Sequence, residues 1–268
     1  MISASPSRLP LFAVAILSLL QNAAFAGAWT QPKDRGQAIA SVTVTKSPSG
    51  FDDDGDVVSI PRYDKLEANL LFEYGVSDWL TAMFQPQLYS VQIAEPTDAD
   101  TFGLGYTEFG GRARLWSDKT SVVSGQVVAR VPGLHDQNNP AEIGHTDPEL
   151  DVRALFGHSF VLNSWQSFVD AQLAYRVRFD DPASEVRVDF TFGVRPMPKL
   201  LLLAQSFNTF ADGSAEGIFS DTREHKVQLS AVWDVSDTWS IQLGGIATVA
   251  GENALRERGV VAALWHRF

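Results

Sequence analysis

Residues 257–268, ERGVVAALWHRF, end the chain and carry the pattern on which the predicted fold depends. Counting back in twos from Phe268 gives His266, Leu264, Ala262 and Val260, which form a mostly apolar set. Successive side chains of a β-strand point to opposite faces, so a period of two indicates a strand with one apolar face. We therefore predict a β-strand that runs to the last residue of the chain.

The same alternation recurs upstream in segments of about ten to twelve residues. In 185–195, for example, Val186, Val188 and Phe190 face one side, while Arg187 and Asp189 face the other. We predict twelve strands, and the chain is therefore expected to be all-β. The predicted strands span 36–46, 64–75, 79–90, 104–116, 120–131, 148–157, 165–179, 185–195, 200–211, 223–234, 238–249 and 257–268.

The connections between the predicted strands alternate between short and long. Three short ones contain a Ser-Asp pair, at 77–78, 117–118 and 236–237, which suits tight turns because both side chains bond nearby backbone. The longer connections lie near 47–63, 91–103, 132–147, 180–184, 212–222 and 250–256. This alternation indicates an up-and-down antiparallel barrel with both chain ends on the short-turn side.

Aromatic residues provide a second indication of a barrel that spans a membrane. The tryptophans, all expected at the rim with the short turns, are Trp29, Trp79, Trp116, Trp165, Trp233, Trp239 and Trp265. A second set, expected near the other rim, is Tyr63, Tyr89, Phe102, Tyr106 and Phe179. Membrane barrels carry aromatic girdles at both interfaces, whereas a soluble β-sandwich buries tryptophan in its core. The predicted fold class is a transmembrane up-and-down antiparallel β-barrel of about 12 strands.

Residues 1–26 have the pattern of a secretory signal peptide. Arg8 supplies a short basic region, an apolar stretch follows, and AFA at 24–26 forms a small-x-small cleavage site before Gly27. An ordinary N-terminal core helix is the alternative for this segment. The expected organisation is a signal peptide at 1–26 and one outer-membrane barrel at 27–268, located in the outer membrane of a Gram-negative bacterium.

Composition excludes several classes of function. The chain has 21 basic and 32 acidic residues, and one basic residue lies in 1–26, so residues 27–268 carry 20 − 32 = −12. This acidic balance argues against a nucleic-acid partner. The chain has no cysteine, which excludes disulfides and thiolate metal sites. No stretch after residue 26 approaches about 20 apolar residues, so no membrane helix is predicted.

Three stretches carry a resemblance to a known family: GAWTQP at 27–32, FDDDG at 51–55 and LFEYGVSDWL at 71–80. Together they resemble small proteobacterial proteins known as XagA-like, close to the barrel family labelled for the MetA pathway of phenol degradation. The resemblance is clearest over 27–85. It implies an outer-membrane barrel with a role in transport or surface polysaccharide, and it brings no site residues.

The final strand also resembles the closing strand of bacterial outer-membrane barrels, whose terminal Phe is read by the assembly machinery. This resemblance implies that Phe268 is an assembly signal. It also implies two kinds of partner, the barrel-assembly machinery and outer-membrane lipids. His266 departs from the pattern, because that position is more often Tyr or an aliphatic residue.

The polar faces of the predicted strands are expected to point into the barrel lumen. The predicted lumen-lining residues are Arg112, Arg114, Arg130, Arg153, Arg176, Arg178, Arg187 and Arg195. The acids on the same strands are Glu108, Glu149, Asp151, Asp170, Glu185 and Asp189, which gives a local charge of 8 − 6 = +2.

Two functions are compatible with this lumen. One is a narrow porin-like pore or transporter for small hydrophilic solutes or surface-polysaccharide units, because arginine pairs with carboxylates and hydroxyls. The other is a non-conducting structural barrel whose lumen is filled by Arg–acid pairs, since a barrel of about twelve strands leaves a modest channel at most.

The predicted long loops are strongly acidic. Their acids are Asp52, Asp53, Asp54, Asp56, Glu95, Asp98, Asp100, Asp136, Glu142, Asp147, Asp180, Asp181, Asp212, Glu216, Asp221 and Glu252. These loops would either repel anions at the pore mouth or simply be solvated and bind divalent ions loosely. The DDDGD stretch at 52–56 is not an EF-hand, because its glycine comes too early and Tyr63 stands where the final Glu belongs.

A lipid-modifying outer-membrane enzyme is the remaining alternative, and it needs a base beside a hydroxyl nucleophile. His225, with Thr209 and Thr248 on adjacent strands, is the strongest candidate, while His158 falls in a predicted turn. Neither gives a convincing pair, so no catalytic residue is assigned and the protein is predicted not to be an enzyme. No metal site and no cofactor are predicted.

Overall fold

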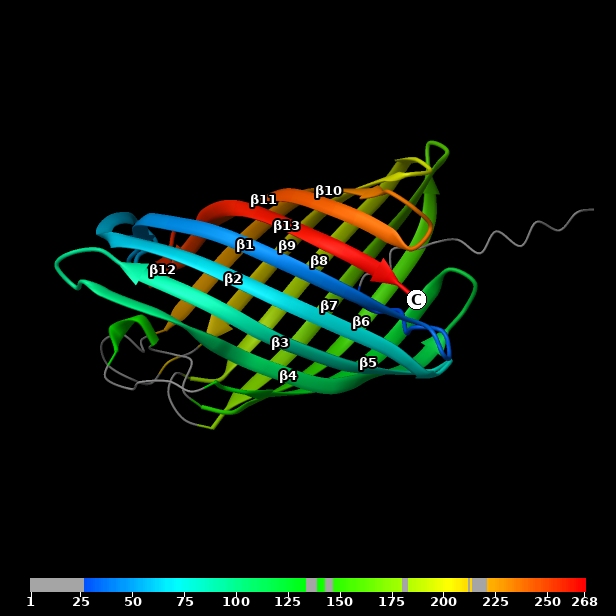
Figure 1. Cartoon of the computed structure of the whole chain (residues 1–268), viewed down its shortest axis with the longest axis horizontal. Helices are drawn as coiled ribbons and strands as arrows, with labels where there is room; N and C mark the ends of the chain where they lie inside the picture. The colour runs from blue at the N-terminus through cyan, green and yellow to red at the C-terminus, as the bar shows by residue number, and fades with distance from the viewer. Residues whose placement is uncertain (1–26, 134–138, 143–146, 180–182, 212, 214–220) are drawn as a thin grey trace, which may run out of the picture.

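The structure is a computed structural model that describes residues 27–133, 139–142, 147–179, 183–211, 213 and 221–268. Within these ranges, twelve long strands and one two-residue strand form a single closed antiparallel sheet (Figure 1). The strands are β1 (Gly36–Phe51), β2 (Val57–Ser77), β3 (Leu80–Ile93), β4 (Ala99–Ser117), β5 (Ser121–Val131), β6 (Glu149–Leu162), β7 (Trp165–Arg178), β8 (Glu185–Met197), β9 (Leu200–Ala211), β10 (Thr222–Asp234), β11 (Trp239–Glu252), β12 (Ala254–Leu255) and β13 (Arg258–Arg267). This confirms the predicted all-β barrel, while the predicted signal peptide lies outside the described residues.

Each long strand pairs with the next one along the chain, and β1 closes the barrel against β13. That seam runs from Gln37 opposite Arg267 to Lys46 opposite Arg258. At its end the backbones of Gly36 and Phe268 exchange two hydrogen bonds, of 2.9 and 3.0 Å. The predicted final strand is therefore correct, and it completes the ring of hydrogen bonds, so the long strands leave no open sheet edge between them.

The strands extend further than predicted on the long-loop side. β1 continues to Phe51 and β2 begins at Val57, so the predicted loop at 47–63 is only a turn at 52–56. The loop predicted at 91–103 is similarly reduced to 94–98. The extension of β1 reads SPSGF at 47–51 and that of β2 reads VVSIPRY at 57–63, and neither has the regular apolar alternation by which strands were predicted. β6 also continues to Leu162, which places His158 in a strand rather than a turn.

Among the described residues, helical structure is limited to a short 3-10 turn, Pro140–Glu142, and no helix is long and apolar enough to cross a membrane.

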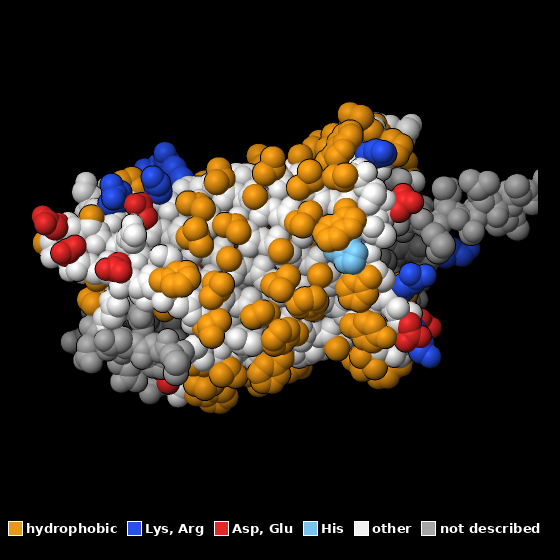
Figure 2. All heavy atoms as spheres, viewed as in Figure 1, with side chains coloured by type: hydrophobic (Ala, Val, Ile, Leu, Met, Phe, Trp, Pro, Cys, Tyr) orange, Lys and Arg blue, Asp and Glu red, His pale blue; other side chains and the backbone are white. Residues whose placement is uncertain are grey.

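The distribution of side chains is the reverse of that in a water-soluble protein. Outward-facing Leu229, Leu243 and Val260, on three adjacent strands, are 66%, 67% and 63% exposed. Polar and charged residues are instead buried inside, among them Arg112 and Asp151. Figure 2 shows hydrophobic side chains over the middle of one face and charged side chains near its two ends. An apolar exterior of this kind requires a lipid environment.

Two tryptophans do not take the places predicted for them. Trp29 and Trp265 lie inside the barrel, where both belong to a cluster around Phe168. The other five, Trp79, Trp116, Trp165, Trp233 and Trp239, are exposed at the short-turn end. In the set predicted for the other rim, Phe102 and Phe179 are exposed, whereas Tyr89 and Tyr106 are buried and Tyr63 is partly buried. Residue type alone could not distinguish the girdle from the lumen, because both accept aromatic residues.

Candidate functional site: the barrel lumen

The N-terminal segment, defined here as residues 27–35, turns back from the start of β1 into the barrel. Ala28 is 0% exposed, in contact with Val122 and Leu155 of the barrel wall. Nearer the rim, Lys33 makes an isolated parallel bridge with Gly75. The chain therefore enters at the short-turn end and reaches into the lumen as far as Gly27.

The barrel wall holds this segment by hydrogen bonds to its backbone. The amide of Ala28 donates to the Asp170 carboxylate at 2.7 Å, and its carbonyl accepts from the Ser124 hydroxyl at 2.6 Å. The amide of Gln31 donates to the Thr81 hydroxyl at 2.7 Å. These bonds satisfy backbone groups that would otherwise be buried without partners.

The side chain of Trp29 occupies a gap that the sequence provides. Its ring packs edge-on against Phe168, with ring centroids 5.9 Å apart. On the neighbouring strand, a Cβ atom at Gly157 would lie only 2.5 Å from the Trp29 ring. Glycine at this inward-facing position is therefore what allows the indole to fit in the lumen.

Arg112 and Glu73 form a buried pair beneath the segment. Their side chains are 2.9 Å apart, and a second guanidinium nitrogen of Arg112 donates to the Trp29 carbonyl at 3.0 Å. The amides of Gln31 and Gln37 both donate to the other Glu73 oxygen, at 2.9 and 2.7 Å. One of the predicted lumen arginines thus fixes the N-terminal segment.

Five of the predicted arginines meet in a network on β5 to β8. Glu149 contacts Arg130, Arg176 at 3.7 Å and Arg178 at 2.8 Å. Glu185 contacts the same Arg176 at 3.0 Å and Arg178 at 2.9 Å. The remaining ion pairs are Arg130–Glu108 at 2.8 Å, Arg153–Asp151 at 3.2 Å, Arg153–Asp189 at 2.8 Å, Arg176–Asp151 at 3.2 Å and Arg187–Glu185 at 3.7 Å.

Five arginines and five acids share this arginine network, so its formal charge is 5 − 5 = 0. The local excess of +2 expected from the sequence is further reduced by acids on other strands. Arg112 is paired with Glu73 of β2, and Arg195 is paired with Asp234 of β10 at 2.9 Å. The charge of +2 expected from the sequence did not include Glu73 and Asp234, because β2 and β10 are not among the strands that carry the eight predicted lumen arginines.

Arg114 differs from the other seven arginines. It is exposed near the short turn after β4, beside a bulge between Arg114 and Trp116. Within the described residues it makes no ion pair. It is therefore a residue of the lumen mouth rather than part of the arginine network.

A second charged cluster, which sequence reasoning missed, lies towards the long-loop end. Glu257, just before β13, contacts Lys65 of β2 at 2.9 Å and also Lys226 of β10. Burial opposes the charge of Glu257, but the two ammonium groups prevail and lower its pKa to about 2. Outward-facing Lys46 and Arg258 lie at this level, which marks it as the rim of the apolar belt.

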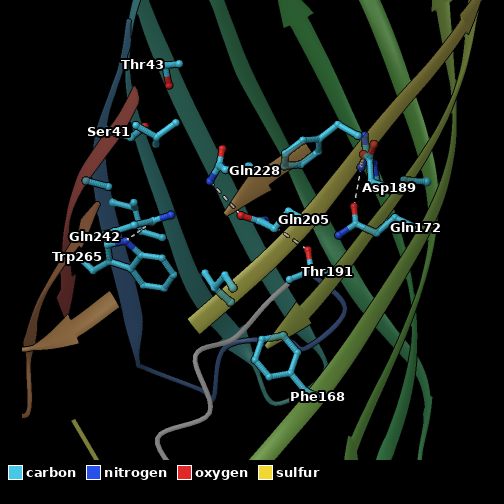
Figure 3. Close-up of a pocket in the computed structure, with 17 residues that line it drawn as sticks. Ser41, Thr43, Phe168, Gln172, Asp189, Thr191, Gln205, Gln228, Gln242 and Trp265 are labelled. Atoms are coloured by element: carbon cyan, nitrogen blue, oxygen red, sulfur yellow. Dashed lines mark hydrogen bonds and ion pairs between the residues drawn. The ribbon is translucent and has the colours of Figure 1, made fainter. Parts of the chain in front are cut away.

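A cavity of about 380 Å³ lies in the lumen beside the N-terminal segment (Figure 3). Amides are prominent in its lining: Gln228 donates to Gln205 at 3.0 Å, and Gln205 donates to the Thr191 hydroxyl at 3.3 Å. Trp265 contributes an aromatic surface and donates through its indole nitrogen to Gln242 at 3.0 Å. The cavity therefore combines uncharged hydrogen-bonding groups and aromatic area with one ion pair in its wall, Arg153–Asp189.

The suggested catalytic groups do not assemble. The His225 ring forms a hydrogen bond with Asn208 at 2.8 Å. The Thr248 hydroxyl instead accepts a hydrogen bond from the Glu257 amide in the lumen. A different pair, His158 and Ser121, lies 2.9 Å apart across β5 and β6, a proximity that only the strand register determines. Neither residue lines the lumen cavity. Asp118 accepts a hydrogen bond from the Ser121 amide rather than from the imidazole.

The described residues of the predicted acidic loops form no metal site. The Asp52 carboxylate accepts hydrogen bonds from the backbone amides of Asp54 and Asp56, at 3.2 and 2.8 Å. Residues 52–56 therefore form a turn held by its own hydrogen bonds. Across the part of the chain that the structure describes, no group of three or more His, Cys, Asp or Glu side chains is arranged to hold a metal. Asp136, Asp180, Asp181, Asp212, Glu216 and the side chain of Glu142 lie outside the described residues.

A closed antiparallel barrel with an apolar exterior and a polar lumen defines the class of outer-membrane β-barrel proteins. Comparison with solved structures finds the same fold in outer-membrane barrels. The COG4313 outer membrane channel from Pseudomonas putida F1 superposes with a TM-score of 0.73 at 15% identity, over 91% of this chain and 98% of that one.

Two other outer-membrane barrels share the fold at lower similarity. The NanC porin has a TM-score of 0.55 at 6% identity, over 85% of this chain and 98% of its own. The translocator domain of autotransporter NalP from Neisseria meningitidis has a TM-score of 0.51 at 9% identity, over 87% and 88%. No protein-family model and no curated protein matches the sequence, so the resemblance to XagA-like proteins stays a prediction.

Proposed function

We propose that this protein is an outer-membrane channel of a Gram-negative bacterium, and that it passes small hydrophilic solutes. The observation that carries the proposal is the lumen cavity of about 380 Å³, lined by Gln205, Gln228, Gln242 and Thr191. A channel of this fold in Pseudomonas putida and the NanC porin support the same general role.

The chemistry of the cavity favours uncharged, polyhydroxylated solutes such as single sugar units. Glutamine amides and the Thr191 hydroxyl can donate and accept hydrogen bonds, and the Trp265 ring offers a flat apolar face. The arginine network is internally neutralised, so it provides little attraction for free anions. The narrow lumen, partly filled by the N-terminal segment, favours single units over polymers.

Liposome swelling and planar-bilayer conductance test this proposal together. Vesicles with the refolded barrel should admit pentoses and hexoses faster than disaccharides, and bilayers should show small conductance steps. Gln205→Phe should slow sugar entry by filling the cavity, whereas Leu229→Phe, on the lipid-facing side of β10, should leave it unchanged. A silent bilayer with no sugar entry would instead favour the non-conducting structural barrel.

We also propose that the barrel is not an enzyme. The His158–Ser121 pair lacks an acid on its imidazole within the described residues, and a nucleophile–base pair needs such orientation. The purified barrel should leave phospholipid and lipid A intact. Hydrolysis that His158→Ala or His225→Ala abolishes would contradict this.

A further inference from the structure

Asp170 of β7 is a buried acid of the lumen that lies apart from the ion pairs of the arginine network. It is 1% exposed, and it accepts the Ala28 amide at 2.7 Å and the Gln172 amide at 2.6 Å. By contrast, Glu149, Asp151 and Glu185 each contact at least two arginines. Among the described residues, Asp170 makes no ion pair. A buried carboxylate without a cationic partner is strongly disfavoured, so a cation placed beside Asp170 would stabilise its charged form.

The backbone of Gly27 lies directly against this carboxylate. A Cβ atom at Gly27 would be 2.8 and 3.0 Å from the two Asp170 oxygens, and 2.0 Å from the Gln172 amide nitrogen. The positive φ of Gly27, 32°, also suits glycine. The nitrogen of Gly27 is bonded to the same α-carbon, so it lies in the immediate vicinity of Asp170.

We propose that Asp170 is the binding site for the chain's own processed N-terminus. Hydrolysis of the Ala26–Gly27 peptide bond by a signal peptidase consumes one water and yields a carboxylate on Ala26, an amine on Gly27 and one proton released to solvent. The amine takes up a proton from solvent, because an α-amino group has a pKa of about 7.7–8.0. Processing thereby turns an uncharged amide into the ammonium that Asp170 lacks.

The pairing has a consequence for the rest of the segment. The new ammonium and the neighbouring Ala28 amide would both bind one carboxylate, about 16 Å along β7 from the rim at Trp165, five residues away. A chain that keeps residues before Gly27 cannot bring its ammonium to the same place, because each added residue moves it by up to about 3.3–3.6 Å. Cleavage is thus the step that secures the N-terminal segment inside the lumen.

The test compares two refolded barrels, one that begins at Gly27 and one that retains residues 24–26. Each is made with Asp170, with Asp170→Asn and with Asp189→Asn as the matched control. Asp189 is a lumen acid on the adjacent strand that is paired with Arg153, so its loss should lower Tm equally in both barrels. Asp170→Asn should lower Tm by several degrees more in the barrel that begins at Gly27 than in the extended one.

A second measurement reads the ammonium directly and does not depend on Tm. In the barrel that begins at Gly27, the α-amine should titrate above its ordinary pKa and react slowly with an amine-specific reagent. Asp170→Asn should restore ordinary titration and fast reaction. Equal Tm losses for Asp170→Asn in both barrels, an unshifted α-amine, or a mature protein whose mass shows a start other than Gly27 would each overturn the proposal.

Discussion

Replacing Glu149 by glutamine removes one negative charge from the centre of the arginine network without changing the size of the side chain. Glu149 is 2% exposed and contacts Arg130, Arg176 and Arg178. After the change, the five arginines of the network share four acids. Each arginine keeps another acid, so the expected loss lies near the lower end for a broken buried pair, about 3 kcal/mol. At about 2–4 °C per kcal/mol for a chain of this size, Tm should fall by about 6–12 °C.

The assay is the temperature at which the folded barrel changes its mobility on cold SDS gels, measured alongside reversal potential in bilayers. Glu108→Gln is the matched control, because Glu108 is 27% exposed and, within the described part of the chain, pairs only with Arg130, which keeps Glu149. The control should lose less than about 1 kcal/mol. Equal losses for the two variants, or no loss for Glu149→Gln, would show that burial of the network does not determine its contribution to stability.

Four further predictions follow from the same structure. Arg114→Glu should shift reversal potential towards cations with little change in Tm. Arg176→Glu should lower Tm, because three acids each lose one of their arginine partners. Equal Tm changes would contradict the assignment of Arg114 to the mouth. The pKa of Glu257 is lowered to about 2, so its stabilising charge is fully present above its ordinary pKa of about 4.5 and is lost as the pH falls towards about 2. Over that pH window the Tm of Glu257→Gln should fall less than the Tm of the wild type. Identical dependence of Tm on acid pH in the two proteins would refute the lowered pKa. Deleting Phe268 should reduce the folded barrel in the membrane while export to the periplasm continues, and an unchanged folded yield would remove the predicted assembly signal. The chain has no cysteine, so a single introduced cysteine can be labelled selectively. Asp53→Cys should react with a membrane-impermeant maleimide on intact cells, and Asp118→Cys should react only after the outer membrane is opened. The reverse labelling would show that the short turns face the outside of the cell.

The barrel was predictable because its signal is repeated in every strand. The alternation of Val186, Val188 and Phe190 with charged residues is reproduced in β8, and the closing strand pairs as its apolar face predicts. Prediction failed where a strand leaves the membrane, since β1 beyond Lys46 no longer needs an apolar face. The lengths of the outer loops therefore could not be read from alternation.

The lumen was only partly predictable. Strand parity places Arg130 and Arg176 inside, but it does not reveal that Glu73 and Asp234 neutralise Arg112 and Arg195 from distant strands. Those contacts depend on how the sheet closes.

The position of the N-terminal segment was likewise not predictable from alternation. Residues 27–35 form no strand, and Trp29 was assigned to a girdle because its neighbour in space, Gly157, is far away in the chain. The inward-facing glycine at 157 was the available indication that something else fills this part of the lumen.

The seam between β1 and β13 has a consequence for the order of folding. It joins the two ends of the described chain, with Gly36 bonded to Phe268, so it is the pairing with the longest separation in sequence. Loop-closure entropy makes such pairings slow to form. The cylinder therefore stays open along one side until late, and this gap gives residues 27–35 a sideways route into the interior. Once the seam forms, the same residues can enter or leave only lengthwise, past the Arg112–Glu73 pair. A barrel whose seam forms early leaves only this lengthwise route to its own N-terminus.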